Sequence, residues 1–565
     1  MQTARRLYVY LLSGIALGTL VVGLSMLLTV LLDTLGLRGT EGVMFGGPDA
    51  TGQQLTLASA LTVVSLPLWL AHWIAAERSV APGRAGADLE RSSDVRGLYF
   101  AVAMGALLLV AAFAARALIE WLVFAVVGDA NNFMASNPAG DLALLLVAGA
   151  AWGYHVALRT RDWRHGQIRD AGAFLPRTYL YLATFIGLMA MLFGIVGLVE
   201  LTGRVLLDEP GVEFGGQGNW WAYPLASSIA GVVVGGTVWV GHWAFAGRLL
   251  ADTGWRGASE RTSRVRLAYY VAVIVVTAAV AVGQLAASAA AALRAAFGIS
   301  EALEAGQVAG LIVLPLIGAV IFGLACELHR RWLAGESETT GVAGRVHTSG
   351  RLEEYGTALV GLAFAGTGVA MLIGVTISTV LTAGRTLGGT DSLLHELSNS
   401  IPMAIFGAAL WIWSWRRASA RFASAPAEEA GATSRRAALL IVVAVSLLTG
   451  VGSLGFILYR VFGAAFGVAL GGDVAAELSQ PSGALIVALV AGLYHATLLR
   501  RDQALRARAE PEAVPATGPE AAAPPSSVVL RLIGPSGADL SAATASMRDS
   551  LPPDYSLEPV PSEPG

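Results

Sequence analysis

The sequence predicts an all-α polytopic membrane protein of about twelve transmembrane helices, arranged as six parallel two-helix repeats. Three observations lead to this fold class. The 565 residues are 55% hydrophobic and only 14% charged, whereas soluble domains carry about 25% charged residues. Apolar segments recur that are long enough to cross the ~30 Å hydrocarbon core, which takes ~20 helical residues. Histidines also close alternate segments at a nearly constant interval.

Twelve segments meet this length criterion. In chain order they are approximately residues 7–32, 55–76, 98–127, 141–158, 178–203, 222–247, 267–293, 308–328, 355–382, 399–416, 437–462 and 481–499. The first is as apolar as a signal peptide, but no small-residue cleavage site closes it. Its opening, "RRLYVYLLSG", also returns in altered form as "PRTYLYLATFIG". We therefore expect a retained membrane anchor.

The second helix of each predicted repeat ends in a cluster of tryptophan, histidine and arginine. The histidines are separated by 83, 87, 87 and 166 residues, and Ser414 lies midway through the last interval, where a sixth histidine would fall. The marker histidines are His72, His155, His242, His329 and His495. This spacing predicts one structural unit repeated along the chain.

The first helix of each repeat opens with arginine and usually tyrosine. The pairs are Arg6 and Tyr8, Arg96 and Tyr99, Arg177 and Tyr179, Arg266 and Tyr269, and Arg351 and Tyr355. The sixth opening, "SRRAALLIV", keeps Arg436 but loses the aromatic residue. The predicted repeats are residues 1–93, 94–172, 173–258, 259–348, 349–430 and 431–505. Each unit crosses twice, so all six should point the same way, unlike the halves of inverted-repeat transporters.

These motifs resemble a bacterial membrane family, the domain of unknown function 5671, repeated in tandem. The first repeat pairs an Arg-Leu-Tyr opening at Arg6, Leu7 and Tyr8 with "PLWLAHW", residues 67–73. The second repeat keeps Trp152 and His155 but lacks the proline, and the last three repeats diverge further. The resemblance covers residues 1–505 and implies a membrane protein, but no activity.

The arginine distribution predicts the orientation. The N-terminus, the loops after even-numbered helices and the segment after helix twelve hold 29 arginines, and the opposite loops hold 6. Because positively charged loops stay in the cytoplasm, both termini and every marker histidine should lie on the cytoplasmic side. With no lysine and 67 glycines, the composition favours a bacterial plasma membrane protein.

The marker histidines have three interpretations. The favoured one is an interfacial anchor, since tryptophan, tyrosine and arginine prefer the headgroup region. The second is cofactor binding, with histidines of different repeats holding haem or a metal. The third is proton handling, because histidine titrates near neutral pH.

Polar residues inside apolar segments mark a candidate substrate pathway. Glu120, Glu200 and Gln284 could line a polar cavity between repeats. They lie toward the outer ends of their helices, however, where pairing with Arg116 or Arg204 along one helix face would satisfy the charges.

Small residues and proline suggest helix contacts rather than chemistry. Three pairs have the G-x-x-x-G spacing that lets helices approach closely: Gly14 and Gly18, Gly149 and Gly153, and Gly231 and Gly235. Pro67, Pro315 and Pro402 should kink their helices. Cys326, the single cysteine, can form no intrachain disulfide.

The chain lacks the motifs of common enzymes. It has no phosphate-binding loop, dinucleotide fingerprint, H-E-x-x-H sequence or nucleophile elbow. We therefore expect no enzyme activity and no bound cofactor. The net charge of −3 argues against nucleic-acid binding.

The segment after the last helix has a different composition. Residues 506–527 form a linker rich in proline, alanine and glutamate. Residues 528–565 alternate in a way that fits a small β-α-β element or an unstructured cytoplasmic tail. Either form could dock a protein partner. The sequence thus favours a membrane scaffold or sensor module. A transporter or channel is the alternative, and a haem- or quinone-linked protein comes third.

Overall fold

The computed structural model describes residues 2–37, 50–127, 138–165, 170–206, 220–299, 305–339, 345–381, 389–466 and 474–509. Every regular element within these ranges is a helix. The predicted linker and β-α-β element of the C-terminal tail lie outside the described residues.

Twelve of the described helices are long, and three are short. The long helices are α1 (Gln2–Thr34), α2 (Ala50–Ser79), α4 (Asp94–Val126), α5 (Pro138–His165), α6 (Asp170–Leu206), α7 (Ala222–Ala251), α9 (Arg264–Ala296), α10 (Ala305–Thr339), α11 (Arg345–Leu381), α12 (Gly389–Ser424), α14 (Thr433–Ala465) and α15 (Val474–Ala509). The short helices are α3 (Ala87–Arg91), α8 (Trp255–Arg261) and α13 (Pro426–Gly431). The short helices have no counterpart among the elements predicted from the sequence.

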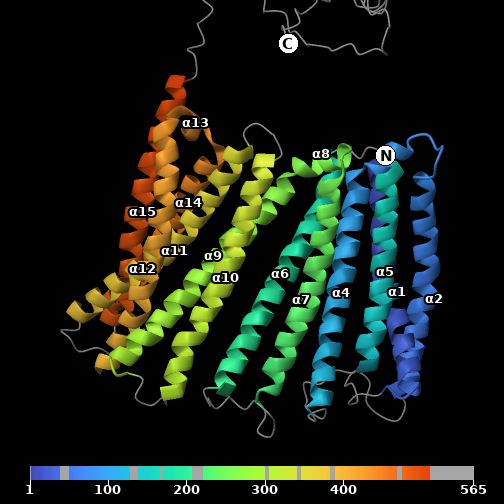
Figure 1. The fold of residues 1–565 in the computed structure, drawn as a ribbon, viewed down its shortest axis with the longest axis horizontal. Coiled ribbons are helices and arrows are strands. Elements are labelled where there is room, and N and C mark those ends of the chain that lie inside the picture. The colour runs from blue at the N-terminus through green and yellow to red at the C-terminus, as the bar shows by residue number, and fades with distance from the viewer. Residues whose placement is uncertain are drawn as a thin grey trace, which may run out of the picture. The chain divides into compact units, whose positions relative to one another are not determined.

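The same order occurs three times: two long helices, a short helix and two long helices. We call α1–α5 the first bundle, α6–α10 the second bundle and α11–α15 the third bundle. Within each bundle the first long helix packs against the second and the fourth. Between bundles, α4 packs against α6 and α7, and α9 packs against α11 and α12. Figure 1 shows the resulting row, with α8, α13 and the N-terminus at the same end of the long helices.

Eleven of the long helices are long and apolar enough to cross a membrane. The twelfth, α12, falls below that level of hydropathy; it includes a polar stretch at Ser398, Asn399 and Ser400. Membrane insertion is thus supported for all three bundles, and eleven spans are found among the described residues instead of the predicted twelve.

Aromatic side chains fill the bundles near the arginine-rich ends of the helices. In the first bundle Tyr99 packs 5.4 Å from Tyr10 and 5.1 Å from Trp73 between ring centroids. In the second bundle Trp243 packs 5.4 Å from Tyr269. Because Tyr and Trp bury large areas and keep a polar handle, these cores can contain hydrogen bonds as well as apolar contacts.

Glycine permits close helix contact at one of the three predicted motifs. A Cβ on Gly235 of α7 would lie 2.6 Å from the backbone nitrogen of Met191 in α6, and one on Gly231 would lie 3.2 Å from the carbonyl oxygen of Ala190. A Cβ on Gly149 or Gly153 would meet no atom within 4 Å. The G-x-x-x-G prediction is thus confirmed for Gly231 and Gly235. It is wrong for Gly149 and Gly153, whose helix faces no backbone there.

Candidate functional site

Each bundle buries one arginine at the N-terminal part of its third long helix, among tyrosine and carboxylate side chains. These central arginines are Arg96, Arg266 and Arg435, and their residues are 0%, 1% and 4% exposed. We call each arginine, the polar groups bound to it and the short-helix glutamate bound to the same tyrosine an arginine cluster. The cluster joins four helices of its bundle, including the short one, and in the first bundle Glu77 of α2 adds a fifth.

In the first arginine cluster, Arg96 of α4 bridges α1 and α5. Its guanidinium donates to Asp162 from Nε (2.9 Å) and Nη2 (2.7 Å), and to the Tyr10 hydroxyl from Nη1 (3.0 Å). Glu90 of α3 accepts from Arg6 Nε (2.6 Å) and from the Tyr10 hydroxyl (3.3 Å). One tyrosine hydroxyl therefore links the buried Arg96–Asp162 pair to the half-buried Arg6–Glu90 pair.

The second arginine cluster repeats this arrangement. Arg266 of α9 donates to Glu336 of α10 from Nε (2.9 Å) and Nη2 (2.5 Å), and to the Tyr181 hydroxyl from Nη1 (2.8 Å). Glu260 of α8 accepts from Arg177 Nε (3.1 Å) and from the hydroxyl of Tyr181. Glutamate replaces the aspartate of the first bundle, and the connectivity is unchanged.

The third arginine cluster has the same connectivity again. Arg435 of α14 donates to Asp502 of α15 (2.7 Å) and to the Tyr355 hydroxyl (3.1 Å). Glu429 of α13 accepts from Arg351 Nε (2.7 Å) and from the Tyr355 hydroxyl (2.7 Å). The prediction of Arg436 as the opening arginine here is wrong, because Arg435 is the buried residue and Arg436 is exposed.

The glutamates on the short helices were missed from the sequence, although a signal was present. In each bundle the glutamate precedes the central arginine by six residues, and an arginine precedes the bridging tyrosine by four. The pairs are Glu90 and Arg96, Glu260 and Arg266, and Glu429 and Arg435. Two constant spacings that recur together would have identified the arginine cluster.

The five marker histidines each make the same kind of hydrogen bond to their own helix. In all five, Nδ1 donates to the carbonyl oxygen four residues earlier, at 2.7 to 2.8 Å. The proton is therefore on Nδ1, and a neutral ring presents Nε2 as an acceptor.

Three of these histidines bind a tyrosine through Nε2. The hydroxyls of Tyr99 and Tyr269 donate to His155 (2.9 Å) and His329 (3.3 Å). Tyr179 donates to His242 in the same way, at 2.9 Å. These three histidines are at most 8% exposed and satisfied inside the protein, which does not favour the interfacial-anchor interpretation for their side chains. Haem or metal ligation does not fit them either, since both ring nitrogens are engaged.

No tyrosine hydroxyl is found bonded to the two remaining histidines or to Ser414 among the described residues. His72 is half-buried, and its ring centroid lies 5.5 Å from that of Tyr8. Ser414 shares a hydrogen bond of 2.9 Å with Thr357, which compensates for the missing histidine. His495 is 3% exposed, and no hydrogen bond to its Nε2 is found among the described residues.

The predicted pathway residues occupy three different helices. Glu120 of α4 pairs with Arg116 at 2.9 Å along the helix, as the alternative interpretation expects. Glu200 of α6 is half-buried and forms no ion pair with Arg204 within 4.0 Å. Gln284 of α9 packs against Gly318 of α10. Their joint role in a substrate pathway stays a prediction.

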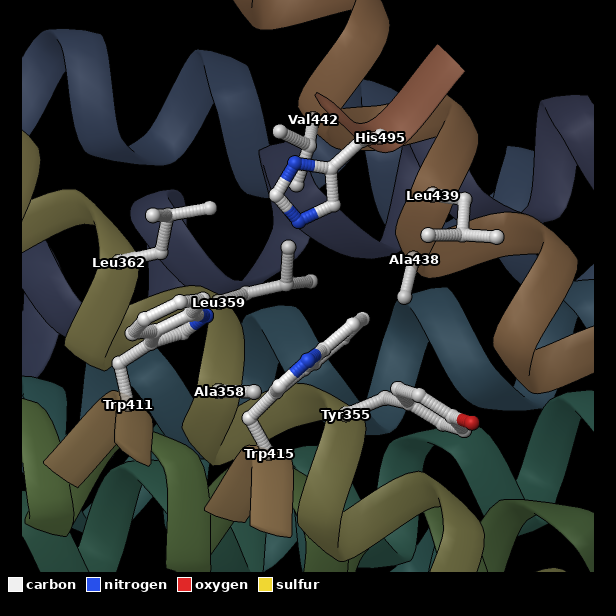
Figure 2. Close-up of a pocket in the computed structure, with 10 residues that line it drawn as sticks. All are labelled: Tyr355, Ala358, Leu359, Leu362, Trp411, Trp415, Ala438, Leu439, Val442 and His495. Atoms are coloured by element: carbon white, nitrogen blue, oxygen red, sulfur yellow. The ribbon is translucent and has the colours of Figure 1, made fainter. Parts of the chain in front are cut away.

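Two pockets lie near the arginine clusters. One, of only about 10 Å³, lies inside the third bundle (Figure 2) and is lined in part by Trp411, Trp415 and His495. A larger one, of about 480 Å³, lies beside the first arginine cluster and combines aromatic residues such as Trp69 with charged ones such as Glu77. Neither lining includes the predicted pathway residues. In the described part of the chain, no group of three or more His, Cys, Asp and Glu side chains could hold a metal ion.

Comparison with known families gives one match. The sequence model of a domain of unknown function, DUF5671, matches at residues 6–150, 177–324 and 351–494. The chain belongs to the DUF5671 family. Each match begins at the arginine that binds the short-helix glutamate, namely Arg6, Arg177 or Arg351. No curated protein and no solved structure matches the chain.

The DUF5671 copies correspond to the bundles. One match spans the four long helices of one bundle, so the chain contains three tandem DUF5671 units. Each unit covers two of the six predicted two-helix repeats, and that finer division stays a prediction. The arginine cluster is therefore a feature of every DUF5671 unit in this protein.

Proposed function

We propose that this DUF5671 protein is a non-catalytic scaffold or sensor module of the bacterial plasma membrane. The arginine clusters carry the proposal. Their charged groups bind one another across four helices or more, so the groups that a catalytic site would offer to a substrate already have partners within the bundle. This arrangement fixes helix positions, which suits a scaffold.

The proposed topology has both termini in the cytoplasm. It is supported by the excess of arginine, 29 against 6, in the segments near the arginine clusters. The exposed arginines there would contact anionic headgroups, making the lipid bilayer the first partner. A protein partner would bind the same side, through the C-terminal tail.

A transporter or channel is the second candidate. One observation favours it: Glu200 is half-buried in α6, and no ion pair to it within 4.0 Å is found in the described residues. An ionisable group in a membrane-spanning helix is costly unless it serves a function. The aromatic filling of the bundles favours the scaffold instead.

Reconstitution into liposomes separates the two candidates. We expect ion and small-solute leakage through vesicles containing the full-length protein to equal that of empty vesicles. Leakage above this background that is lost in both Glu120→Gln and Glu200→Gln would overturn the scaffold proposal. Glu327→Gln is the matched control, because Glu327 lies on the surface of α10 and pairs with Arg330 and Arg331.

A further inference from the structure

The first bundle has an open pocket between the arginine-rich ends of α2 and α5. Both helices pack on α1, and the space between their ends has a volume of about 480 Å³. Pockets that bind small molecules have volumes of about 300–1,000 Å³. In Figure 1, α2 lies at one end of the row of helices, so no second bundle covers it. The pocket is therefore accessible from outside the bundle.

The lining of this pocket changes from apolar to charged along α2. Trp69, Leu70 and Ile74 line the part nearer the middle of the helix, and Glu77 and Arg78 follow at its end. Trp69 and Arg78 are about 14 Å apart along the helix axis. Leu70 and Ile74 are 40% and 43% exposed, so apolar surface stays uncovered at the edge of the pocket. A phospholipid has the same order of groups, because its apolar chains lead to a charged phosphate.

The charged part of the pocket favours an anion. Both oxygens of Glu77 already bind arginine, since Oε1 accepts from Nη2 of Arg96 at 2.9 Å and Oε2 accepts from Nη2 of Arg161. Asp162 accepts two further hydrogen bonds from Arg96. Arg78, by contrast, is exposed, and no acceptor for its guanidinium is found among the described residues. A phosphate would accept the charge-assisted hydrogen bonds that Arg78 can donate.

This combination of space and charge belongs to the first unit. Three residues after the second marker histidine of the unit, the first bundle has Leu158, and the second has Trp332. The Trp332 ring stacks on the counterpart of Trp73, at 5.5 Å between ring centroids. The smaller leucine leaves room beside Trp73, which lines the pocket. In the third bundle, Ala420 takes the place of Arg78, so the cation is missing there.

We propose that this pocket binds one phospholipid, with its phosphate against Arg78 and its glycerol and upper chains along Trp69 and Ile74. The inference rests on the contact with the bilayer named in the proposed function, and it replaces a general attraction with a single binding site. The two proposals fail separately. Lipid binding is measured on protein in detergent, whereas the scaffold proposal is tested by leakage from liposomes.

Native mass spectrometry of the full-length protein in detergent tests the proposal. We expect one tightly retained phosphatidylglycerol per chain. Diacylglycerol has the same chains without the phosphate and should bind about 10-fold more weakly, because the charge-assisted hydrogen bonds are lost. Glycerol 3-phosphate has the phosphate without the chains and should bind about 100-fold more weakly, because it buries little apolar surface.

Two pairs of variants locate the site. Arg78→Gln should weaken phosphatidylglycerol binding about 10-fold, whereas Arg248→Gln should bind like the wild type. Arg248 is the matched control, because it is exposed at the equivalent position of the second unit. Ala81→Trp adds a large ring to the lining and should abolish binding. Ala85→Trp is its control, since Ala85 is exposed in the same loop and lies outside the lining. Unchanged melting temperatures verify that the variants are folded.

The proposal fails if the wild type retains no phosphatidylglycerol, or if Ala81→Trp retains it like the wild type. Equal weakening by Arg78→Gln and Arg248→Gln would also overturn it, because that result indicates a general attraction of lipid to surface arginines. Diacylglycerol binding as tight as that of phosphatidylglycerol would exclude a role for the phosphate. Equally tight binding of glycerol 3-phosphate would assign the pocket to a free phosphate ester instead of a lipid.

Discussion

A buried guanidinium is stable only if its charge is matched by nearby groups. Arg96 meets this condition with Asp162 and Glu77, to which Nη2 donates at 2.9 Å, and with the Tyr10 hydroxyl. Its guanidinium carbon also lies 5.0 Å from the centre of the Phe100 ring, where a cation is attracted by the aromatic face. The central arginine is thus held by charge, hydrogen bonds and ring contacts together.

Removing the central arginine should destabilise the first bundle strongly. Arg96→Leu would remove both hydrogen bonds that the buried Asp162 accepts from Arg96 and leave it the longer, 3.6 Å pairing with half-exposed Arg161, which should cost about 3–5 kcal/mol of unfolding free energy. Thermal unfolding in detergent measures the effect. Arg331→Leu is the control: this side chain is 74% exposed and pairs only with surface Glu327, so the expected loss is below ~1 kcal/mol. Equal losses in the two variants would show that the arginine cluster does not hold the bundle together.

Residue-level prediction succeeded where a sequence pattern was visible. The marker histidines were found from their spacing. Of the tyrosines that bind the central arginines only Tyr355 was predicted, and Tyr10 and Tyr181 were missed; the predicted Tyr8 is 58% exposed. The buried environment of the histidines was not predicted, because the pattern of tryptophan, histidine and arginine is also typical of a membrane interface. Burial depends on which helices pack together, and the short helices that supply Glu90, Glu260 and Glu429 have too few residues to show a periodicity.

At the scale of elements, the position of each helix depends on how closely its backbone approaches the next. The contact between α6 and α7 is made through glycine on both helices, with Gly194 facing Gly231 and Gly187 facing Gly235. Small residues are the main means of close packing between helices in lipid, where burial of apolar surface supplies little driving force.

A methyl group should therefore be tolerated at some glycines and not at others. Gly235→Ala would place Cβ 2.6 Å from the Met191 nitrogen, and the strain should cost about 1–3 kcal/mol. Gly149→Ala meets nothing within 4 Å and should leave stability unchanged or raise it by up to ~1 kcal/mol. The melting temperatures of the two variants check this difference. A Gly235→Ala protein as stable as the wild type would mean that α6 and α7 are not in backbone contact.

Spacing alone could not separate these glycines. With 67 glycines in the chain, the G-x-x-x-G motif arises often without a partner helix. The positions of the long helices, by contrast, were predicted well, because a long apolar segment in a membrane can adopt few structures other than a helix. Each predicted span lies within an observed long helix or overlaps most of one, and the observed helices extend beyond the apolar segments.

At the scale of the whole molecule, the three DUF5671 units are joined by one repeated contact. The third long helix of one bundle packs against the first two of the next, as α4 does on α6 and α7, and as α9 does on α11 and α12. The same contact made twice in one direction gives a row of three units. The sequence indicated a repeat of about 85 residues, whereas the family units are twice as long. The reason is that each unit carries two marker positions, one in each half, and the interval between successive markers is nearly the same within a unit as between units.

The central claim is that all three units insert in the same orientation, with their arginine clusters on the cytoplasmic side. Single cysteines introduced into a Cys326→Ser background test it directly, by labelling intact cells with a membrane-impermeant maleimide. Cysteines at exposed Arg84, Thr253 and Ser424, near the three clusters, should stay unlabelled until the cells are opened. Cysteines at Leu35, Leu206 and Phe466, which are 75%, 79% and 79% exposed at the other ends of the helices, should label in intact cells. A unit whose two positions label in the reverse order would contradict the account.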